Sequence, residues 1–441
     1  MSMKYAKTKY GCLKGFRNST YTGFFGIPYA KPPISALRWK APEEPDGWEG
    51  TRDATQFPKR CIQGEPIPGE FYQKEFNEEN AYIPLESEDC LYLNIWTPAE
   101  KPGKEYPVVM WIHGGGFTAG NGSEIEFDGR EYAKRGVILV SINYRLGVFG
   151  FFCHPWLKEE AGHSGNYGIL DQIQALKWIQ ENIEAFGGDP DRVTIMGQSA
   201  GAISVQTLVT SKLTKGLFRG AIMQSGGGYR TGFAGKMTDS KAEENGKVIA
   251  QLLAAESLEQ LRVVPAEKLY QAACEAEKNL VGADNGLKFL PVLDGYVLER
   301  GYDEALELRE TADVSYLLGS TSDDFQLAKV GSNEIPALDK GTMQWSLINE
   351  KNGRKPAYVY HFERKLPGDN AGAFHSSELW YMFGTLRRCW RPMTVADMEL
   401  SNRMCDYWTN FIKNGDPNGE KLPKWEACCE KNLYVQKLDI C

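Results

Sequence analysis

The stretch from Arg192 to Ser204, "RVTIMGQSAGAIS", decides how the rest of the chain is interpreted. An apolar run of strand composition precedes Gly197, and small residues that can open a helix follow Gly201. Glycines on both sides of Ser199 relieve the crowding of a tight turn from strand to helix, and the helix that follows points its positive end at the turn. The pattern therefore predicts that Ser199 is an exposed nucleophile. The alternative is that Ser199 only caps the helix.

Segments of strand and helix character alternate around this turn. Residues 107–117, "PVVMWIHGGGF", and 137–145, "VILVSINYR", contain continuous apolar runs typical of strands covered on both faces. Apolar residues repeat at helical spacing through 169–186, and two glycines end that helix. Further strands are predicted at "RVTIM", "RGAIMQSG", "VSYLLGS" and "AYVYHF". The alternation predicts an α/β fold with a mostly parallel central sheet and helices on both faces.

We expect residues 1–441 to form one catalytic domain, because α/β folds of this length often form a single unit. Between about residues 226 and 310 the pattern is weaker, more charged and partly helical. We interpret this stretch as a helical insertion or cap that covers the edge of the sheet and the active site.

Composition excludes several classes of protein. The chain is 42% hydrophobic and 24% charged, as expected for a folded soluble protein, and its net charge is −8. A negative chain repels phosphate backbones and anionic lipids, so neither a nucleic acid nor a membrane is expected as a partner. The N-terminus has no apolar signal region, which favours a cytoplasmic location. The ten cysteines form no C-x-x-C pair, which disfavours a zinc ribbon or a thioredoxin-type site.

A second motif, "HGGGF", follows a predicted strand at residues 113–117. Acyl transfer produces an oxyanion, and consecutive glycine N–H groups can bind it without steric obstruction. The expected donors are Gly115 and Gly116, with the N–H of Ala200 as a third. A phosphate-binding loop is disfavoured, because neither the Gly-Lys-Ser/Thr sequence nor the G-x-G-x-x-G spacing is present.

A serine nucleophile needs a base, which is normally histidine. The serine–acid–histidine order of α/β-hydrolases leaves only the histidines that follow Ser199. His361 lies within a strand-like segment, whereas His375 lies in a small-residue loop ahead of a probable helix. We therefore expect His375 to be the base, although an isolated loop histidine is usually just solvated. The chain has five histidines: His113, His154, His163, His361 and His375.

Taken together, these motifs resemble one family, the type-B carboxylesterases, which include para-nitrobenzyl esterases and cholinesterases. The resemblance runs from about residue 8 to residue 430. It rests on "GIPYAKPP", "SEDCLYLNIWTP", "WIHGGGF", "NYRLGVFGF", "GNYGILDQIQALKWIQENIEAFGGDP", "GQSAGA" and "FHSSELWYMFG" in the family's order. It implies an α/β-hydrolase fold and hydrolysis of carboxylic esters. It also implies that Ser199 is the nucleophile and His375 the base, with an oxyanion hole formed by Gly115, Gly116 and Ala200.

The acid departs from the family's pattern. Where the family usually has glutamate, this chain has the second aspartate of "SDD", Asp324, only 375 − 324 = 51 residues before His375. Asp324 is one methylene shorter than glutamate, so the loop or the histidine must lie closer. The resemblance assigns the acid to Asp324 and a loop-fixing hydrogen bond to Asp323. Asp323 and Glu378 remain alternatives for the acid.

Two other positions also differ. Gln198 stands where cholinesterases have glutamate, which removes a negative charge beside the serine and disfavours a choline-type substrate. Cys61 and Cys90 fall where secreted relatives have a disulfide, and we expect them to stay reduced in the cytoplasm.

The resulting hypothesis is a serine esterase with a Ser-His-Asp triad that acts on small to medium uncharged esters. It needs no metal or organic cofactor, its partner is a small-molecule ester, and a monomer or weak dimer is plausible. One alternative is a deacylase of acetylated or aromatic sugar esters, in which the basic cluster Arg387–Arg391 binds a polar leaving group. Such a cluster is more often a solvated or salt-bridged face. The other alternative is a non-catalytic binding protein on the same fold, and such relatives typically lose the serine.

Overall fold

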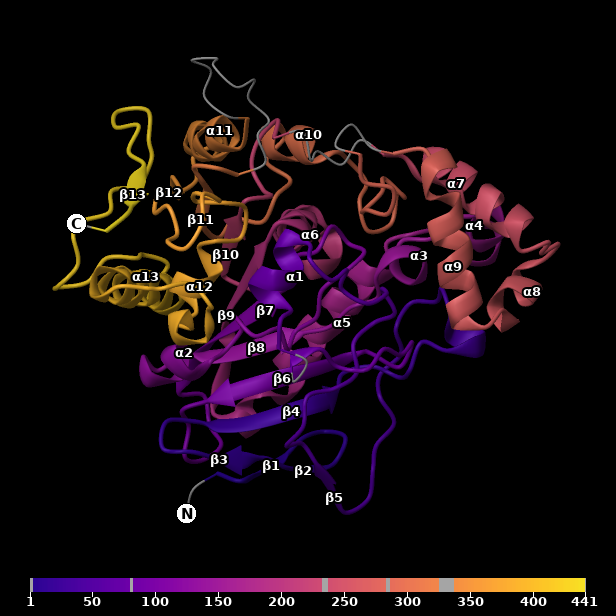
Figure 1. Ribbon diagram of the computed structural model, residues 1–441, viewed down its shortest axis with the longest axis horizontal. Helices are drawn as coiled ribbons and strands as arrows, with labels where there is room; N and C mark the ends of the chain where they lie inside the picture. Colours follow the sequence, from indigo (N-terminus) through magenta and orange to yellow (C-terminus); the bar gives the residue numbers. More distant parts are fainter. Residues whose placement is uncertain (1–2, 80–81, 232–236, 283–285, 325–336, 441) are drawn as a thin grey trace.

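A computed structural model describes residues 3–79, 82–231, 237–282, 286–324 and 337–440 (Figure 1). Within these residues, ten strands form one sheet in the order β13-β12-β11-β10-β9-β7-β8-β6-β4-β3. The strands are β3 (Phe16–Arg17), β4 (Thr22–Pro28), β6 (Tyr92–Thr97), β7 (Tyr106–Ile112), β8 (Ile138–Ile142), β9 (Gly188–Gln198), β10 (Gly220–Gln224), β11 (Ser315–Thr321), β12 (Tyr358–Phe362) and β13 (Gln436–Leu438). A small second sheet contains β1 (Tyr5–Lys7), β2 (Cys12–Lys14) and β5 (Thr51–Asp53).

The sheet is parallel from β8 through β7 and β9 to β13, and antiparallel where β8, β6, β4 and β3 pair. This arrangement confirms the predicted, mostly parallel sheet. The strands expected from "RVTIM", "RGAIMQSG", "VSYLLGS" and "AYVYHF" are β9, β10, β11 and β12. Parallel strands place their carboxyl ends at one edge of the sheet, where ligands bind in open α/β folds.

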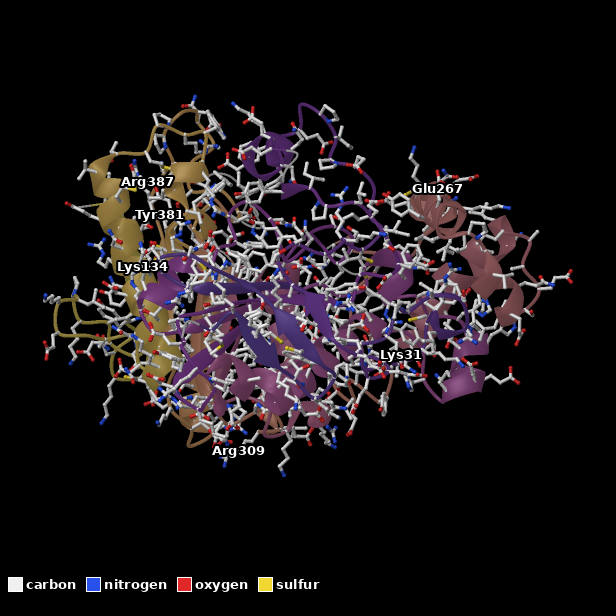
Figure 2. The ribbon with its side chains drawn as sticks, turned by 90° about the horizontal axis from the view of Figure 1, so that it is seen from below. Lys31, Lys134, Glu267, Arg309, Tyr381 and Arg387 are labelled. Atoms are coloured by element: carbon white, nitrogen blue, oxygen red, sulfur yellow. The ribbon has the colours of Figure 1, made fainter. Side chains whose placement is uncertain are left out.

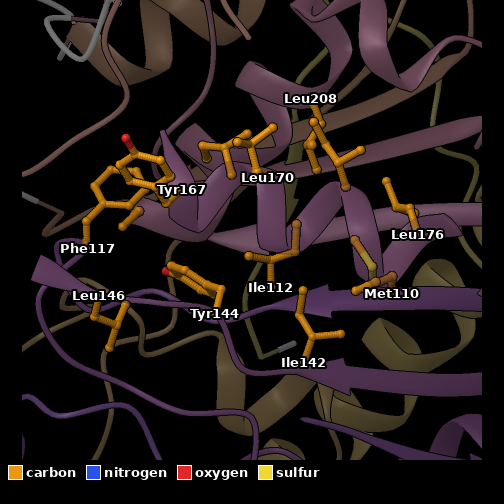
Figure 3. Packing of buried hydrophobic residues seen from close by; sticks show 14 of the residues in the cluster. Met110, Ile112, Phe117, Ile142, Tyr144, Leu146, Tyr167, Leu170, Leu176 and Leu208 are labelled. Carbon is orange, nitrogen blue, oxygen red and sulfur yellow. The ribbon is translucent and has the colours of Figure 1, made fainter. Parts of the chain in front are cut away.

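Helices cover both faces of the sheet, as predicted (Figure 1). Strand β7 shows why: Met110 and Ile112 belong to one buried cluster, and Val109 and Trp111 to a second. Alternate residues of a strand point to opposite faces, so a strand that is apolar at every position needs a core on each side. Figure 3 shows Met110 and Ile112 on the side of Leu176 and Leu208. The first core contains residues of α5 (Tyr167–Asn182) and α6 (Ala200–Thr210), and the second contains residues of α2 (Arg130–Lys134), α12 (Leu379–Met382) and α13 (Val395–Asn414).

The stretch between about 226 and 310 forms several short helices. Helices α7 (Asp239–Leu252), α8 (Leu258–Val263) and α9 (Ala266–Ala276) lie at the opposite end of the molecule from α13, and Glu267 marks α9 in Figure 2. Helix α9 contacts α3 (Gly147–Gly150), and α8 contacts the short helix η1 (Ser35–Leu37). Helix α10 (Tyr302–Glu307) packs instead on α6 and α11 (Ala337–Lys351). The remaining helices are α1 (Phe71–Phe76), α4 (Pro155–Ala161), η3 (Ile183–Phe186), η4 (Lys212–Thr214), η5 (Glu277–Asn279) and η6 (Leu386–Arg388).

A buried ion pair ties the loop after β8 to α5. Nε of Arg145 lies 2.8 Å from Oδ2 of Asp171, and Nη2 lies 2.7 Å from Oδ1. The backbone N–H of Arg145 also donates to Oδ2. The two side chains are 3% and 0% exposed. Buried charges are tolerated only when they are paired and hydrogen-bonded, so each depends on its partner.

Removal of one partner should therefore be strongly destabilising. We expect Asp171→Ala to lower the free energy of unfolding by about 3–5 kcal/mol, because Arg145 would keep a buried, uncompensated charge. Glu304→Ala breaks a pair with Arg300 whose side chains are 57% and 42% exposed, and it should cost no more than about 1 kcal/mol. Urea denaturation followed by tryptophan fluorescence measures both changes. Equal small losses would mean that the buried pair does not fix the loop.

Candidate active site

Ser199 lies on the turn between β9 and α6, in the strained conformation φ 57°, ψ −125°. The turn is tight: a Cβ on Gly197 would lie 2.3 Å from the carbonyl oxygen of Gly201, and one on Gly201 would lie 2.1 Å from that of Ile112. Neither position could carry a side chain without moving the backbone. Ser199 occupies the N-cap position of α6, but its side chain makes no capping hydrogen bond. Helix capping therefore does not explain why this residue is a serine.

The half-buried Ser199 opens onto a cavity of about 340 Å³. The cavity brings together the predicted nucleophile, the predicted base and the glycine loop. Its walls are Tyr72, Phe76, Asn77, Gly114, Gly115, Gly116, Ala119, Gly120, Glu124, Glu126, Phe127, Gln198, Ser199, His375, Ser376 and Leu379.

The buried side chain of Asp324 reaches the histidine despite its short length. Its Oδ1 lies 2.6 Å from Nδ1 of His375, and its Oδ2 accepts a hydrogen bond from the N–H of Thr321 at 3.1 Å. Burial opposes ionisation, but the neighbouring imidazole and these hydrogen bonds hold the pKa of Asp324 below its ordinary value. Asp324 is therefore a carboxylate that can orient the ring of His375.

Asp323 has a different environment. Its Oδ2 accepts a hydrogen bond from the N–H of Ala373 at 2.8 Å, and its backbone forms an isolated bridge with Phe374. Both contacts hold the segment that immediately precedes His375. Asp323 therefore anchors the histidine loop, while its neighbour contacts the ring.

Glu378 is fully buried close to the same site. Burial, followed by the charge of Asp324, raises the pKa of Glu378 to about 8. Its Oε1 accepts a hydrogen bond from the amide of Gln224 at 3.3 Å, and that amide's oxygen accepts from the indole N–H of Trp408 at 3.2 Å. A carboxyl group that keeps its proton at neutral pH cannot stabilise an imidazolium ion, so Glu378 is a poor candidate for the acid.

The glycine loop follows β7. Gly115 and Gly116 adopt left-handed conformations, with φ 95° and 62°, and both line the cavity. Ala200 is the first residue of α6. His113 stacks on Tyr144, with ring centroids 4.5 Å apart, and burial lowers its pKa to about 4. It is therefore a neutral, structural member of the loop.

Three other histidines have structural surroundings. His154 accepts a hydrogen bond from the N–H of Trp156 at the start of α4, and His163 stacks on Tyr296. Nδ1 of His361 lies 3.2 Å from a carboxylate oxygen of Glu363. Of the five histidines, all in the described part of the chain, only His375 lines the cavity with Ser199.

Sequence reasoning missed two residues that contact His375. The side-chain nitrogen of Gln198 lies 3.2 Å from Nε2 of His375, which fits a neutral ring with its proton on Nδ1, directed toward Asp324. The hydroxyl of Tyr72, on α1, donates to the carbonyl oxygen of His375 at 3.2 Å. Nothing in the sequence around Tyr72 signals this contact. Gln198 is adjacent to the serine and could have been found.

The basic cluster at 387–391 is engaged within the fold. Arg391 is buried and pairs with Glu75 at 2.9 Å and with Asp369 at 2.7 Å. Arg388 forms an ion pair with Asp128. These two arginines thus belong to a salt-bridged face, the structural alternative that the sequence allowed.

Cys61 and Cys90 are both buried free thiols in this structure. A hydrogen bond between the two thiols, together with burial, raises the pKa of Cys90 well above its ordinary value.

The strand order, the strained serine between strand and helix, and a carboxylate after a later parallel strand together define the class of α/β-hydrolases. Comparison with known proteins is more specific. The profile of the Carboxylesterase family matches residues 2–347 and 335–440, so the chain belongs to the carboxylesterase family and is a carboxylic ester hydrolase.

Several relatives align over nearly the whole chain. Para-nitrobenzyl esterase of Bacillus subtilis is 35% identical, with 100% of this chain and 95% of the relative covered. Human cocaine esterase is 32% identical, with 96% and 84% covered. Among solved structures, a PNB esterase superposes with a TM-score of 0.84 at 32% identity, covering 99% of this chain and 96% of its own. A Geobacillus stearothermophilus carboxylesterase superposes with a TM-score of 0.82 at 31% identity, covering 99% of this chain and 96% of its own.

None of the helices in the described ranges combines the length and the apolar character needed to cross a membrane.

The buried Glu378 makes stability depend on pH. Its pKa rises from an ordinary 4.5 in the unfolded chain to about 8 in the folded state, so the folded state holds an extra proton between these values. Its contribution to stability is therefore present below pH 4.5 and is lost as the pH rises toward 8. Glu378→Gln removes this effect. We expect the free energy of unfolding of the variant, relative to that of the parent, to rise by a few kcal/mol from pH 5 to pH 8. Urea denaturation at the two pH values measures this change.

The surface variant Glu304→Gln serves as the control and should follow the parent at both pH values. A Glu378→Gln variant that also follows the parent would show that Glu378 is ionised in the folded protein.

Proposed function

We propose that ester hydrolysis in this protein proceeds through a triad of Ser199, His375 and Asp324. The observation that carries the proposal is the 2.6 Å contact between Nδ1 of His375 and Oδ1 of Asp324, at a cavity that His375 shares with Ser199. The contact fixes the ring tautomer in which Nε2 can accept the serine proton.

In the first step, Nε2 of His375 takes the proton of Ser199 as the serine oxygen attacks the ester carbonyl carbon. The resulting oxyanion is bound by the N–H groups of Gly115, Gly116 and Ala200. His375 then protonates the departing alcohol, which leaves an acyl-enzyme. Water, activated by the same histidine, hydrolyses the acyl-enzyme to the acid and restores Ser199.

The substrates we propose are small to medium uncharged esters. Among the described residues that line the cavity, none is lysine or arginine, and an amide, Gln198, stands next to the serine. A second cavity of about 270 Å³ shares the wall residues Gly116 and Ala119 with the first, and its lining includes Leu287 and Phe289 as well as the charged Glu277 and Lys288. Two cavities that share the glycine loop as a wall suit a substrate with one group on each side of its carbonyl.

Ser199→Ala tests the nucleophile. With para-nitrophenyl acetate, the parent should release nitrophenol and the variant should lose more than about 10³-fold in kcat, because the acyl-enzyme cannot form. Ser257→Ala, at the start of α8, is the matched control and should retain full turnover. A Ser199→Ala variant that remains active would exclude the proposal, and an inactive parent would favour a non-catalytic binding protein.

The two adjacent aspartates can be separated by the same assay. Asp324→Asn should lower kcat by about 10³–10⁴-fold, because an amide oxygen cannot stabilise the imidazolium ion. Asp323→Asn keeps an oxygen that can accept a hydrogen bond from the N–H of Ala373. It should therefore lower kcat by less than about tenfold. The opposite order of losses would transfer the role of the acid to Asp323.

A further inference from the structure

Two carboxyl side chains in the wall of the Ser199 cavity have no role in the proposed reaction. Glu124 and Glu126 lie on the loop between β7 and α2, and both line the cavity. Glu126 is only 1% exposed, and Glu124 is half-buried. A polar pair in this position needs an explanation, because carboxyl groups are rarely buried without partners.

The hydrogen bonds of the pair are incomplete within the protein. Glu124 accepts from the N–H of Asn121 at 2.7 Å, and the side chains of Glu124 and Glu126 bond to each other. Oε2 of Glu126 is buried without a hydrogen-bond partner among the described residues. A buried polar atom that lacks a partner, on a residue in the wall of a cavity, is suited to bind a group that enters the cavity.

The charge of the pair limits what that group can be. Burial, followed by the charge of Glu124, raises the pKa of Glu126 well above its ordinary value, and burial raises the pKa of Glu124 to about 7. The nearby charge of Arg60 lowers the pKa of Glu124. The charge of Glu75, which is itself paired with Arg391, raises the pKa of Glu126. At neutral pH the pair thus keeps at least one proton and offers both a donor and an acceptor.

A hydroxyl group is the complement of such a pair, because it also donates one hydrogen bond and accepts others. An ammonium group only donates, so it could bond to the acceptors of the pair but not to its donor. A carboxylate group would be repelled. The aromatic rings of Tyr72, Phe76 and Phe127 line the same cavity and can pack against a carbon skeleton.

The position of His375 indicates which part of the ester lies here. The departing alcohol receives its proton from His375, so it must lie on the side of the carbonyl where the histidine is. His375 lines the cavity of Glu124 and Glu126 and does not line the second cavity near Leu287. The pair is therefore next to the alcohol portion of the substrate.

We propose that Glu124 and Glu126 bind a hydroxyl group on the alcohol portion of the substrate, so that the enzyme prefers esters of polyols to esters of simple alkanols. This inference rests on the proposed triad and narrows its substrate class. The preference is expressed in kcat/KM, because an ester without the hydroxyl leaves the buried carboxyl pair unsatisfied.

The test compares 1-acetylglycerol with n-butyl acetate, and release of acetic acid is followed by titration. The ratio of the two kcat/KM values should fall by about tenfold or more in Glu126→Leu, and Glu126→Gln should recover part of it. Glu304→Gln, on helix α10, which lines neither cavity, should keep the ratio of the parent. An unchanged ratio in Glu126→Leu would overturn the proposal.

Two further measurements complete the design. Acetylcholine is assayed in parallel, and a preference for it that Glu126→Leu abolishes would assign the pair to a cation instead. If Glu126→Leu does not fold, competition in the parent decides: glycerol should inhibit hydrolysis of para-nitrophenyl acetate at lower concentration than 1-propanol, and equal inhibition would overturn the proposal. Failure of the parent to hydrolyse para-nitrophenyl acetate would contradict the triad itself, which separates the two hypotheses.

Discussion

The rest of the site depends on the tight turn where β9 passes into α6. The missing Cβ atoms of Gly197 and Gly201 let the first turn of the helix lie against the carbonyl of Ile112 at the end of β7. That approach forces Ser199 into φ 57° and exposes its side chain to the cavity. It also brings the start of α6 next to the glycine loop, since that loop begins where β7 ends. One steric constraint thus positions both the proposed nucleophile and the proposed oxyanion hole.

The proposed acid and base are held by a second, polar constraint. Asp323 fixes the backbone at Ala373, and two residues later His375 meets Asp324. Adjacent carboxylates repel each other, but here they have different partners. Asp323 binds the backbone N–H of Ala373, and Asp324 contacts the ring of His375. The loop is therefore anchored by the same short segment that supplies the acid. This explains how aspartate can reach the ring even though its side chain is one methylene shorter than glutamate.

Much of this could be predicted from the sequence, for identifiable reasons. Buried parallel strands are apolar at every position, so β7 to β12 stand out, and the motif around Ser199 has few structural solutions. The chain order of α/β-hydrolases leaves His361 and His375 of the five histidines, and the loop position of His375 favours it. What could not be predicted depends on long-range packing. Tyr72 reaches His375 from helix α1, about 300 residues earlier in the chain, and the hydroxyl of Thr385, just after α12, donates to the carbonyl oxygen of the buried Glu126. Local periodicity contains no information about such contacts.

The same packing determines how strongly the pKa of each carboxyl group around the cavity is shifted. Asp324 keeps its charge because an imidazole and a backbone N–H compensate it, whereas Glu378, buried beside it without a cation, is held neutral. Burial likewise raises the pKa values of Glu124 and Glu126. The order of these pKa values therefore depends on which carboxyl groups have a charged or hydrogen-bonding partner in the folded protein. The carboxyl with a low pKa is suited to orient the base, and those with raised pKa values are suited to bind an uncharged substrate.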